Sequence, residues 1–218
     1  MLSEENISDL VIYMKLPRYI AFADQVCCPE TLPARINRLY QLGVPAVRLR
    51  VPEASDRQKL DWLQKIKKPA GSLLLVSDRP DLARLSSADG VHLTAGGLDA
   101  FSVRRLLNDS FLVGASTHSL TEVRNAASLG LDYVIFSPIF PTPSKPDLKE
   151  KDCHGLEGLQ QAADATSLPV YALGGITAER IPACLQAGAY GAAGISALFA
   201  PTDPTKNWKK IKSALNEL

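Results

Sequence analysis

The sequence alternates eight times between a short apolar run and a segment with helical periodicity, each pair spanning roughly 25 residues. Strands that alternate with helices indicate a parallel sheet. The runs are apolar almost throughout, which is typical of strands buried on both faces. Eight units predict a closed (β/α)8 barrel, and no G-x-G-x-x-G motif follows the first run as it would in a dinucleotide-binding sheet. The expected strands are residues 18–24, 46–50, 71–78, 90–94, 112–116, 133–140, 170–174 and 191–196.

Capping residues mark the starts of several expected helices. Ser55 precedes a segment with apolar residues on one face, and Ser119 is followed three residues later by Glu122, which completes a capping box. Thr177 is the expected N-cap of the helix after the seventh strand. Besides the helix that begins after Ser55, the expected helices are residues 30–42, 79–85, 99–107, 120–129, 156–165, 178–187 and 208–215.

Length and composition predict one domain and exclude several classes of protein. The 218 residues suit a single barrel at 18–218, preceded by a short N-terminal extension at 1–17. A net charge of +1 gives no sign of a nucleic-acid partner. The four cysteines lack C-x-x-C spacing, and the acidic start does not resemble a signal peptide. We therefore expect a cytoplasmic protein with no membrane partner, and a homo-oligomer remains open.

Two small-residue strand ends near the C-terminus predict a phosphate site. Gly174 and Gly175 follow the seventh apolar run, and Ile195 and Ser196 end the eighth. Glycine lets backbone N–H groups approach an anion closely, and many (β/α)8 barrels bind phosphate after strands seven and eight. We call these four residues the phosphate cup. The alternative interpretation is two ordinary buried strands with glycine turns.

Polar side chains follow the other strands, at the face where such barrels carry their chemistry. Hydroxyls, arginines and a lysine suit a phosphorylated substrate, and Asp78 can supply one carboxylate to Mg²⁺. Structural interpretations stand beside these: Asp78 caps a helix, His92 is a satisfied core histidine, and His118 completes a turn. No chemical role is expected for His154. The candidate residues are Arg48, Arg50, Ser77, Asp78, His92, Ser116, His118, Thr142, Ser144 and Lys145.

Seven short motifs, in order, resemble the thiamine phosphate synthase and thiazole tautomerase superfamily. The resemblance covers about residues 18–200 and is strongest in the P-I-F-P-T-P-S-K segment at 138–145. The other six motifs are V-R-L-R at 47–50, L-L-V-S-D-R at 74–79, A-D-G-V-H-L at 88–93, G-A-S-T-H-S at 114–119, G-G-I at 174–176 and I-S-A at 195–197. Members of this superfamily are (β/α)8 barrels, in agreement with the strand pattern.

The resemblance implies an enzyme that binds a thiazole phosphate. In the synthase, this compound is joined to hydroxymethylpyrimidine pyrophosphate with the help of Mg²⁺. By the same resemblance, Gly175, Ile195 and Ser196 hold the thiazole phosphate, while Arg50 and Ser116 contact pyrophosphate. Thr142, Ser144 and Lys145 meet the carboxylate or pyrophosphate end, and Asp78 binds Mg²⁺.

The chain departs from the synthase pattern in the pyrophosphate half of the site. The synthase motif Q-L-R-x-K is replaced by R-L-R-V-P, so Arg48 stands for the glutamine and Pro52 for the lysine. Ser77 replaces an asparagine, and Gly97 stands where a second Mg²⁺ carboxylate is expected, with Asp99 two residues late. Mg²⁺ is therefore an uncertain cofactor.

These departures favour a divergent member similar to the tautomerase, which moves a proton without metal. That branch uses a histidine on the sixth strand, where this chain has Pro138. Acid–base chemistry would then belong to His118 or His92, with Lys145 as a further catalytic candidate. An active synthase and a non-catalytic barrel that binds thiazole or thiamine phosphate remain alternatives, whereas motifs of a phosphosugar isomerase are missing. The polar loop at 141–154 is expected to act as a lid.

Overall fold

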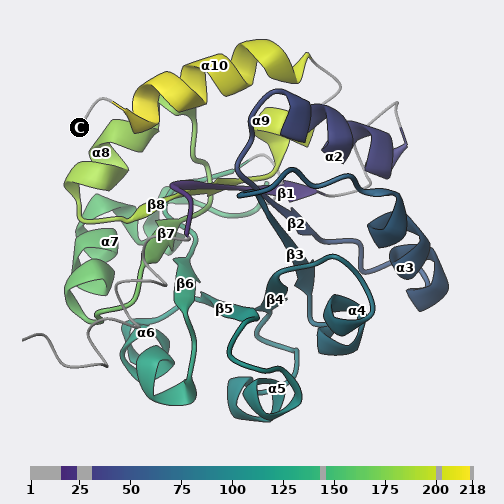
Figure 1. Ribbon diagram of the computed structural model, residues 1–218. Coiled ribbons are helices and arrows are strands. Elements are labelled where there is room, and N and C mark those ends of the chain that lie inside the picture. Colours follow the sequence, from purple (N-terminus) through teal and green to yellow (C-terminus); the bar gives the residue numbers. More distant parts are fainter. Residues whose placement is uncertain (1–15, 24–30, 143–145, 200–202, 217–218) are drawn as a thin grey trace, which may run out of the picture.

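Eight parallel strands form a closed barrel in sequence order, surrounded by helices (Figure 1). The computed structural model describes residues 16–23, 31–142, 146–199 and 203–216. This confirms the predicted (β/α)8 barrel. The strands are β1 Tyr19–Ala23, β2 Ala46–Leu49, β3 Leu73–Ser77, β4 Gly90–Leu93, β5 Leu112–Thr117, β6 Tyr133–Phe136, β7 Val170–Ala172 and β8 Gly191–Gly194.

Helices follow the strands and cover the outside of the barrel (Figure 1). The C-terminal helix α10 packs on the two helices before it, α8 (Ile181–Gln186) and α9 (Ser196–Phe199), near the paired strands β8 and β1. The helices are α2 Leu32–Gln41, α3 Asp56–Lys65, α4 Pro80–Arg84, α5 Ala100–Leu106, α6 Leu120–Ala126, α7 Gly155–Asp164, α8 Ile181–Gln186, α9 Ser196–Phe199 and α10 Pro204–Leu215, with short 3-10 helices η2 Ala127–Leu129, η3 Glu150–Asp152 and η4 Ala178–Arg180. None of the helices in the described part of the chain is long and apolar enough to cross a membrane.

The predicted caps at Ser55 and Ser119 are confirmed. Ser55 Oγ accepts a hydrogen bond from the Gln58 N–H, and Ser119 Oγ accepts one from the Glu122 N–H at 3.3 Å. The capping box differs in one bond, because the Glu122 carboxylate accepts from the N–H of His118 rather than from that of Ser119. The start of α6 therefore also fixes the backbone of His118.

Several predicted boundaries were wrong in the C-terminal half. The predicted sixth strand ran to residue 140, but β6 ends at Phe136, before a cis peptide bond between Ser137 and Pro138. Thr177 is the N-cap, as predicted, but of the 3-10 helix η4 that precedes α8, and its side chain makes no capping hydrogen bond. The short helix α9 was not predicted.

The N-terminal extension and the lid are only partly within the described residues. Residues 1–15 and 143–145 lie outside them. Of the extension, Leu16 is 5% exposed, and its carbonyl accepts a hydrogen bond from the Tyr190 hydroxyl. The described part of the expected lid, the loop at 141–154, contains the 3-10 helix η3. Closure of this loop over the site remains a prediction.

The inside of the barrel is apolar over most of its length. Its buried cluster comprises Leu16, Ile20, Phe22, Ala46, Leu75, Leu112, Tyr133, Ile135, Tyr171 and Ala193. Near the C-terminal ends of the strands, polar residues replace these apolar side chains. His92 on β4 reaches Tyr133 on β6, two strands away, which shows that both side chains point into the barrel.

Candidate active site

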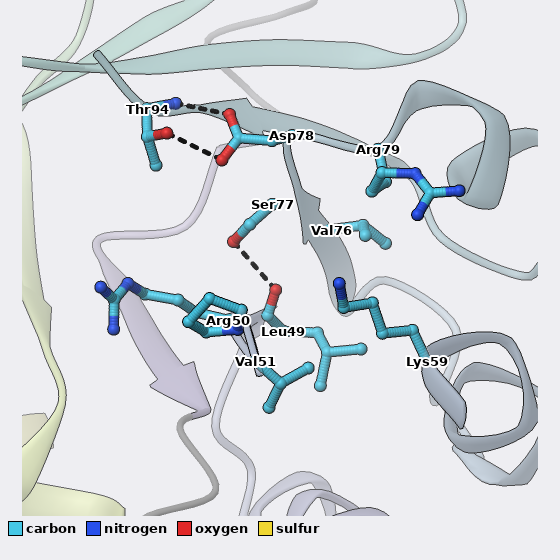
Figure 2. Close-up of a pocket in the computed structure, with 10 residues that line it drawn as sticks. Leu49, Arg50, Val51, Lys59, Val76, Ser77, Asp78, Arg79 and Thr94 are labelled. Carbon is cyan, nitrogen blue, oxygen red and sulfur yellow. Dashed lines mark hydrogen bonds between the residues drawn. The ribbon is translucent and has the colours of Figure 1, made fainter. Parts of the chain in front are cut away.

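A buried arginine lies at the polar end of the barrel interior. Arg48 is 1% exposed, and its guanidinium carbon lies 4.5 Å from the centroid of the Phe22 ring. Its Nε donates to Ser77 Oγ at 2.9 Å. The Ser77 hydroxyl in turn donates to the Leu49 carbonyl at 2.9 Å (Figure 2). Burial lowers the pKa of Arg48 to about 10. Among the described residues, Arg48 Nη2 has no hydrogen-bond partner.

His92 is fully buried and has a partner at each ring nitrogen. Nδ1 lies 3.0 Å from the Tyr133 hydroxyl, and Nε2 lies 3.0 Å from Ser116 Oγ. Tyr133 can reach His92 because Gly114, on the strand between them, has no side chain. A Cβ atom on Gly114 would occupy the space of the Tyr133 ring. Burial first, and then the charge of Arg48, hold the pKa of His92 well below its usual value. His92 is therefore neutral and orients Ser116, as the structural interpretation of this histidine expects.

Asp78 is bound to the loop that follows β4. Its Oδ1 accepts from the Thr94 N–H at 2.7 Å, and its Oδ2 accepts from the Thr94 hydroxyl at 2.8 Å (Figure 2). The backbone of Asp78 has a φ of 54°, a left-handed conformation that aspartate tolerates better than most residues. The expectation that Asp78 caps a helix was wrong, because Arg79 occupies the N-cap position of α4.

The residues present do not fit the Mg²⁺ site that the family resemblance implies. Residue 97, where the resemblance expects the second carboxylate, is a glycine, and a Cβ atom there would meet Asp78 Oδ1. Asp99 is occupied elsewhere, since it caps α5 by accepting from the Ser102 N–H at 2.8 Å. Within the described residues, no group of three His, Cys, Asp or Glu side chains is arranged to hold a metal. Mg²⁺ prefers octahedral oxygen ligands and would find one carboxylate that already accepts two hydrogen bonds.

A cavity of about 340 Å³ lies between the ends of β2 and β3 and helix α3 (Figure 2). Lys59 extends into it from α3, and Arg79 lies on its other side. Arg79 pairs with Asp56 and Asp81, and Lys59 Nζ lies 3.8 Å from Asp56 Oδ1. The lining comprises Leu49, Arg50, Val51, Pro52, Lys59, Val76, Ser77, Asp78, Arg79 and Thr94.

Lys59 was not among the predicted site residues. It lies four residues before the buried Leu63, on the same face of α3, and its side chain is 16% exposed. Its place beside Pro52 depends on how α3 packs on the barrel. A cation therefore stands next to the position where the resemblance expects a lysine. The spacing of Lys59 from Leu63 and Ile66, on the inner face of the helix, is the sequence signal that could have singled it out.

His118 follows β5 and is exposed at the C-terminal end of the barrel. Its Nδ1 lies 2.8 Å from the Ser137 carbonyl oxygen and 3.3 Å from Ser137 Oγ. A carbonyl only accepts hydrogen bonds, so Nδ1 carries the proton and Nε2 of the neutral ring keeps its lone pair. Among the described residues, this is the histidine whose geometry suits a general base.

The carbonyls of the two glycines in the predicted phosphate cup accept hydrogen bonds from neighbouring groups. The Gly174 carbonyl accepts from the Phe140 N–H at 3.0 Å, and the Gly175 carbonyl accepts from Arg180 Nη1 at 2.7 Å. For the N–H groups of Gly175 and Ile195, no backbone acceptor exists within the described part of the chain. Gly174 and Gly175 have φ values of 99° and 62°, which other residues rarely adopt.

Three predicted residues cannot be assigned a geometry. Ser144 and Lys145 lie outside the described residues, and so does the side chain of Ser196, whose backbone begins α9. Thr142 is half-buried at the end of the described part of its loop. The structure brings Arg48, Ser77, His92 and Ser116 together in the barrel interior, whereas Asp78 is turned toward Thr94.

This architecture defines a single-domain (β/α)8 barrel with its polar residues gathered at the C-terminal face of the strands. Residues 19–198 match the thiamine monophosphate synthase family, and the chain belongs to this family of enzymes.

Curated relatives match over most of their own length. The putative thiamine-phosphate synthase 2 of Aquifex aeolicus is 38% identical over 186 residues, covering 84% of this chain and 98% of the relative. The thiamine-phosphate synthase of Caldivirga maquilingensis is 39% identical over 178 residues, covering 80% and 85%. Among solved structures, the thiamine phosphate pyrophosphorylase of Pyrococcus furiosus superposes with a TM-score of 0.82 at 27% identity, covering 94% of this chain and 98% of that chain.

Proposed function

We propose that this protein binds a thiazole phosphate and catalyses a metal-independent proton shift on it, as a divergent thiazole tautomerase-like member of the family. The observation that carries the proposal is the position of the Asp78 carboxylate, which accepts two hydrogen bonds from Thr94. Residue 97, where the resemblance expects the second Mg²⁺ carboxylate, is a glycine, and a Cβ atom there would meet Asp78 Oδ1. The family's Mg²⁺-dependent condensation would lack its metal ligands here. A proton shift needs an acid and a base and no leaving group.

In the proposed reaction, the phosphate cup holds the phosphate of the substrate. The N–H groups of Gly175 and Ile195 supply donors, and Ser196 contributes from the start of α9. Thr142, Ser144, Lys145 and Arg50 meet the opposite, anionic end. This arrangement orients the thiazole ring between the cup and the barrel interior.

His118 is the proposed acid–base residue. Its Nδ1–H is fixed on the Ser137 carbonyl, so Nε2 can take a proton from one ring position and return it at another. Atoms and charge balance without a co-reactant. Ser116, held by neutral His92, hydrogen-bonds the substrate and steadies the developing charge.

An active synthase is the second candidate, and Lys59 is the observation that favours it. Lys59 enters the cavity beside Pro52 and can replace the lysine that the synthase motif has at that position. A pyrophosphate leaving group would then find Arg50, Lys59 and Arg79 around one cavity. A non-catalytic thiazole phosphate-binding barrel is the third candidate, and it differs from the first only in lacking turnover.

Deuterium transfer tests the proposed reaction. The protein is incubated in D₂O with a thiazole carboxylate phosphate in its less stable tautomeric form, with a chelator present, and the product is followed by proton NMR. We expect faster conversion than in buffer, with deuterium entering at the position that gains the proton. A protein that binds the compound but leaves its conversion rate unchanged would contradict the tautomerase and support the non-catalytic barrel.

A further inference from the structure

His154 connects the loop after β6 back to the strand from which this loop departs. Its N–H donates to the Pro138 carbonyl at 2.9 Å, and the next N–H, of Gly155, donates to the Ile139 carbonyl at 3.0 Å. Its ring stacks on the ring of Phe136 in β6, with centroids 4.2 Å apart and an interplanar angle of 28°. His154 is therefore fixed against the end of β6 by its backbone and by its side chain.

The imidazole of His154 also hydrogen-bonds to backbone groups of His118 and Ser137. Both bonds favour the protonated ring, as carbonyl acceptors do and N–H donors do not, so His154 donates to these two carbonyls. Burial outweighs the two bonds and lowers the pKa of His154 below its usual value. The ring is therefore neutral at neutral pH, and its N–H is the donor.

The Ser137 carbonyl oxygen consequently accepts from two imidazoles. The other donor is His118 Nδ1, at 2.8 Å. A carbonyl oxygen has two lone pairs and can accept a hydrogen bond at each. A second donor on the same oxygen restricts the direction in which the carbonyl points, and thereby the position from which His118 reaches it.

His118 has a competing partner in the same residue. Ser137 Oγ lies 3.3 Å from His118 Nδ1 and, unlike the carbonyl, can donate as well as accept. Donation from this hydroxyl would place the proton of His118 on Nε2, which would then have no lone pair to offer. The carbonyl selects the opposite tautomer, so the group that fixes the carbonyl also decides whether Nε2 can act as a base.

The first turn of α7 leaves room for the His154 ring. A Cβ atom on Gly158 would lie 2.8 Å from His154 Cβ and 3.8 Å from its Nδ1. Glycine weakens the interior of a helix, and at this position its missing side chain allows the histidine to stay against β6.

We propose that His154 is a positioning residue for His118. By holding the Ser137 carbonyl, it keeps the proton of His118 on Nδ1 and the lone pair on Nε2, where the substrate can reach it. His154 itself exchanges no proton with the substrate. The inference rests on the proposed function for the role of His118 in turnover, whereas the tautomer of His118 is a property of the protein without substrate.

Nitrogen NMR of the full chain, labelled with ¹⁵N in histidine, reads this tautomer directly, because protonated and unprotonated ring nitrogens differ in chemical shift. The sequence has three histidines, and His118→Gln identifies the signals of His118. At slightly alkaline pH, where the rings are neutral, we expect wild-type His118 to carry its proton on Nδ1.

His154→Phe keeps a ring to stack on Phe136 but has no donor for the Ser137 carbonyl. The Nε2–H tautomer of His118 should become populated in this variant. The kcat of the proton shift should fall about 3- to 10-fold, the scale of one neutral hydrogen bond. KM should stay within about twofold, because the phosphate cup is untouched.

Three further variants separate positioning from stability. His154→Gln retains an N–H donor and should keep most of the wild-type tautomer and rate. Gly158→Ala leaves the histidine in the chain but displaces it, so it should shift the tautomer in the same direction as His154→Phe, and it serves if His154→Phe does not fold. Ala162→Gly weakens α7 about two turns further along the helix and should lower stability without changing the His118 tautomer.

The outcomes distinguish the positioning role from the proposed function. The same His118 tautomer in wild type, His154→Phe and Gly158→Ala would overturn the inference, and so would an equal shift in Ala162→Gly or a wild-type His118 protonated on Nε2. If wild-type protein shows no proton shift while the tautomer responds to His154→Phe, the proposed function is wrong and the inference stands. If wild-type protein turns over and the tautomer does not respond, only the inference is wrong.

Discussion

The carboxylate of Asp78 occupies the space that a side chain at position 97 would need. A Cβ atom on Gly97 would collide with Asp78 Oδ1, which accepts a hydrogen bond from the Thr94 N–H. The absence of a side chain at residue 97 and the turned conformation of Asp78 are therefore parts of one arrangement. A carboxylate introduced at position 97 is therefore not expected to create a metal site by itself, because the carboxylate of Asp78 would also have to move.

Gly97→Asp should destabilise the protein without creating Mg²⁺ affinity. Forcing a side chain into this space costs about 1–3 kcal/mol, the usual range for overpacking. Gly96→Asp is the matched control, because a Cβ atom there has no neighbour within 4 Å. Urea unfolding should separate the two variants, and calorimetry should detect no Mg²⁺ binding to either. A Gly97→Asp variant as stable as wild type that binds Mg²⁺ would show that Asp78 is free to turn.

Gly175→Ala should weaken binding of thiazole phosphate by ~10-fold or more, equivalent to about 1.4 kcal/mol. The new methyl group would meet Pro141 O and Phe140, at a residue with a φ of 62°, and would displace the N–H from the cup. Gly71→Ala is the control, since Gly71 has a φ of 80° but no neighbour within 4 Å of a Cβ. It should lose stability and keep its affinity. Equal affinities of the two variants in calorimetry would count against the cup.

His118→Gln should slow tautomerisation by ~10²–10⁴-fold, the usual contribution of general acid–base catalysis. Thiazole phosphate affinity should change little, because the phosphate cup is untouched. His154→Gln provides a comparison: His154 stacks on Phe136 with ring centroids 4.2 Å apart and hydrogen-bonds to the backbone of His118 and Ser137, but has no proposed chemical role. Initial rates by NMR should fall much less in this variant than in His118→Gln. Comparable rates in His118→Gln and wild type would show that another residue is the acid–base group.

The lowered pKa of His92 predicts that the protein loses stability at mildly acidic pH. Its folded-state pKa lies well below 6.5, chiefly because of burial, so the unfolded chain takes up a proton that the folded protein refuses. The unfolded state binds more protons, and stability falls as pH decreases below 6.5, by up to ~1.4 kcal/mol per pH unit. His154, whose pKa is also lowered, contributes in the same direction. Urea unfolding at several pH values should give a shallower dependence for His92→Gln, whereas parallel curves would contradict this assignment.

The order of the strands and helices could be predicted from the sequence because apolar runs and capping residues are local features. Apolar runs predicted all eight strands, and Ser55 and Ser119 marked two helix starts through side chains that bond within their own first turn. The end of β6 was missed because apolar residues continue past Ser137 although the ladder does not. Thr177 marked its helix start correctly, but a favourable residue type does not ensure a capping hydrogen bond.

Candidate site residues could be named from the sequence, but their contacts could not. Gly174 and Gly175 were singled out from their type and position, their carbonyls accept hydrogen bonds from Phe140 and Arg180, and their role in anion binding stays a prediction. The commitment of Asp78 to Thr94 and the open Nη2 of Arg48 depend on neighbouring strands and loops. The place of Lys59 in the cavity depends on the packing of a whole helix, although its spacing from Leu63 could have singled it out.

The rate of thiamine phosphate formation, with and without Mg²⁺, tests the central claim most directly. Purified protein is given thiazole phosphate and hydroxymethylpyrimidine pyrophosphate, beside a synthase that has the complete motifs, and tautomerisation is assayed on the same preparation. We predict condensation at least ~10²-fold slower than in the complete synthase, the scale of losing one electrostatic contact to the leaving group, together with metal-independent tautomerisation. Rapid Mg²⁺-dependent thiamine phosphate formation would contradict the account and assign the lost functions to Lys59 and Arg48.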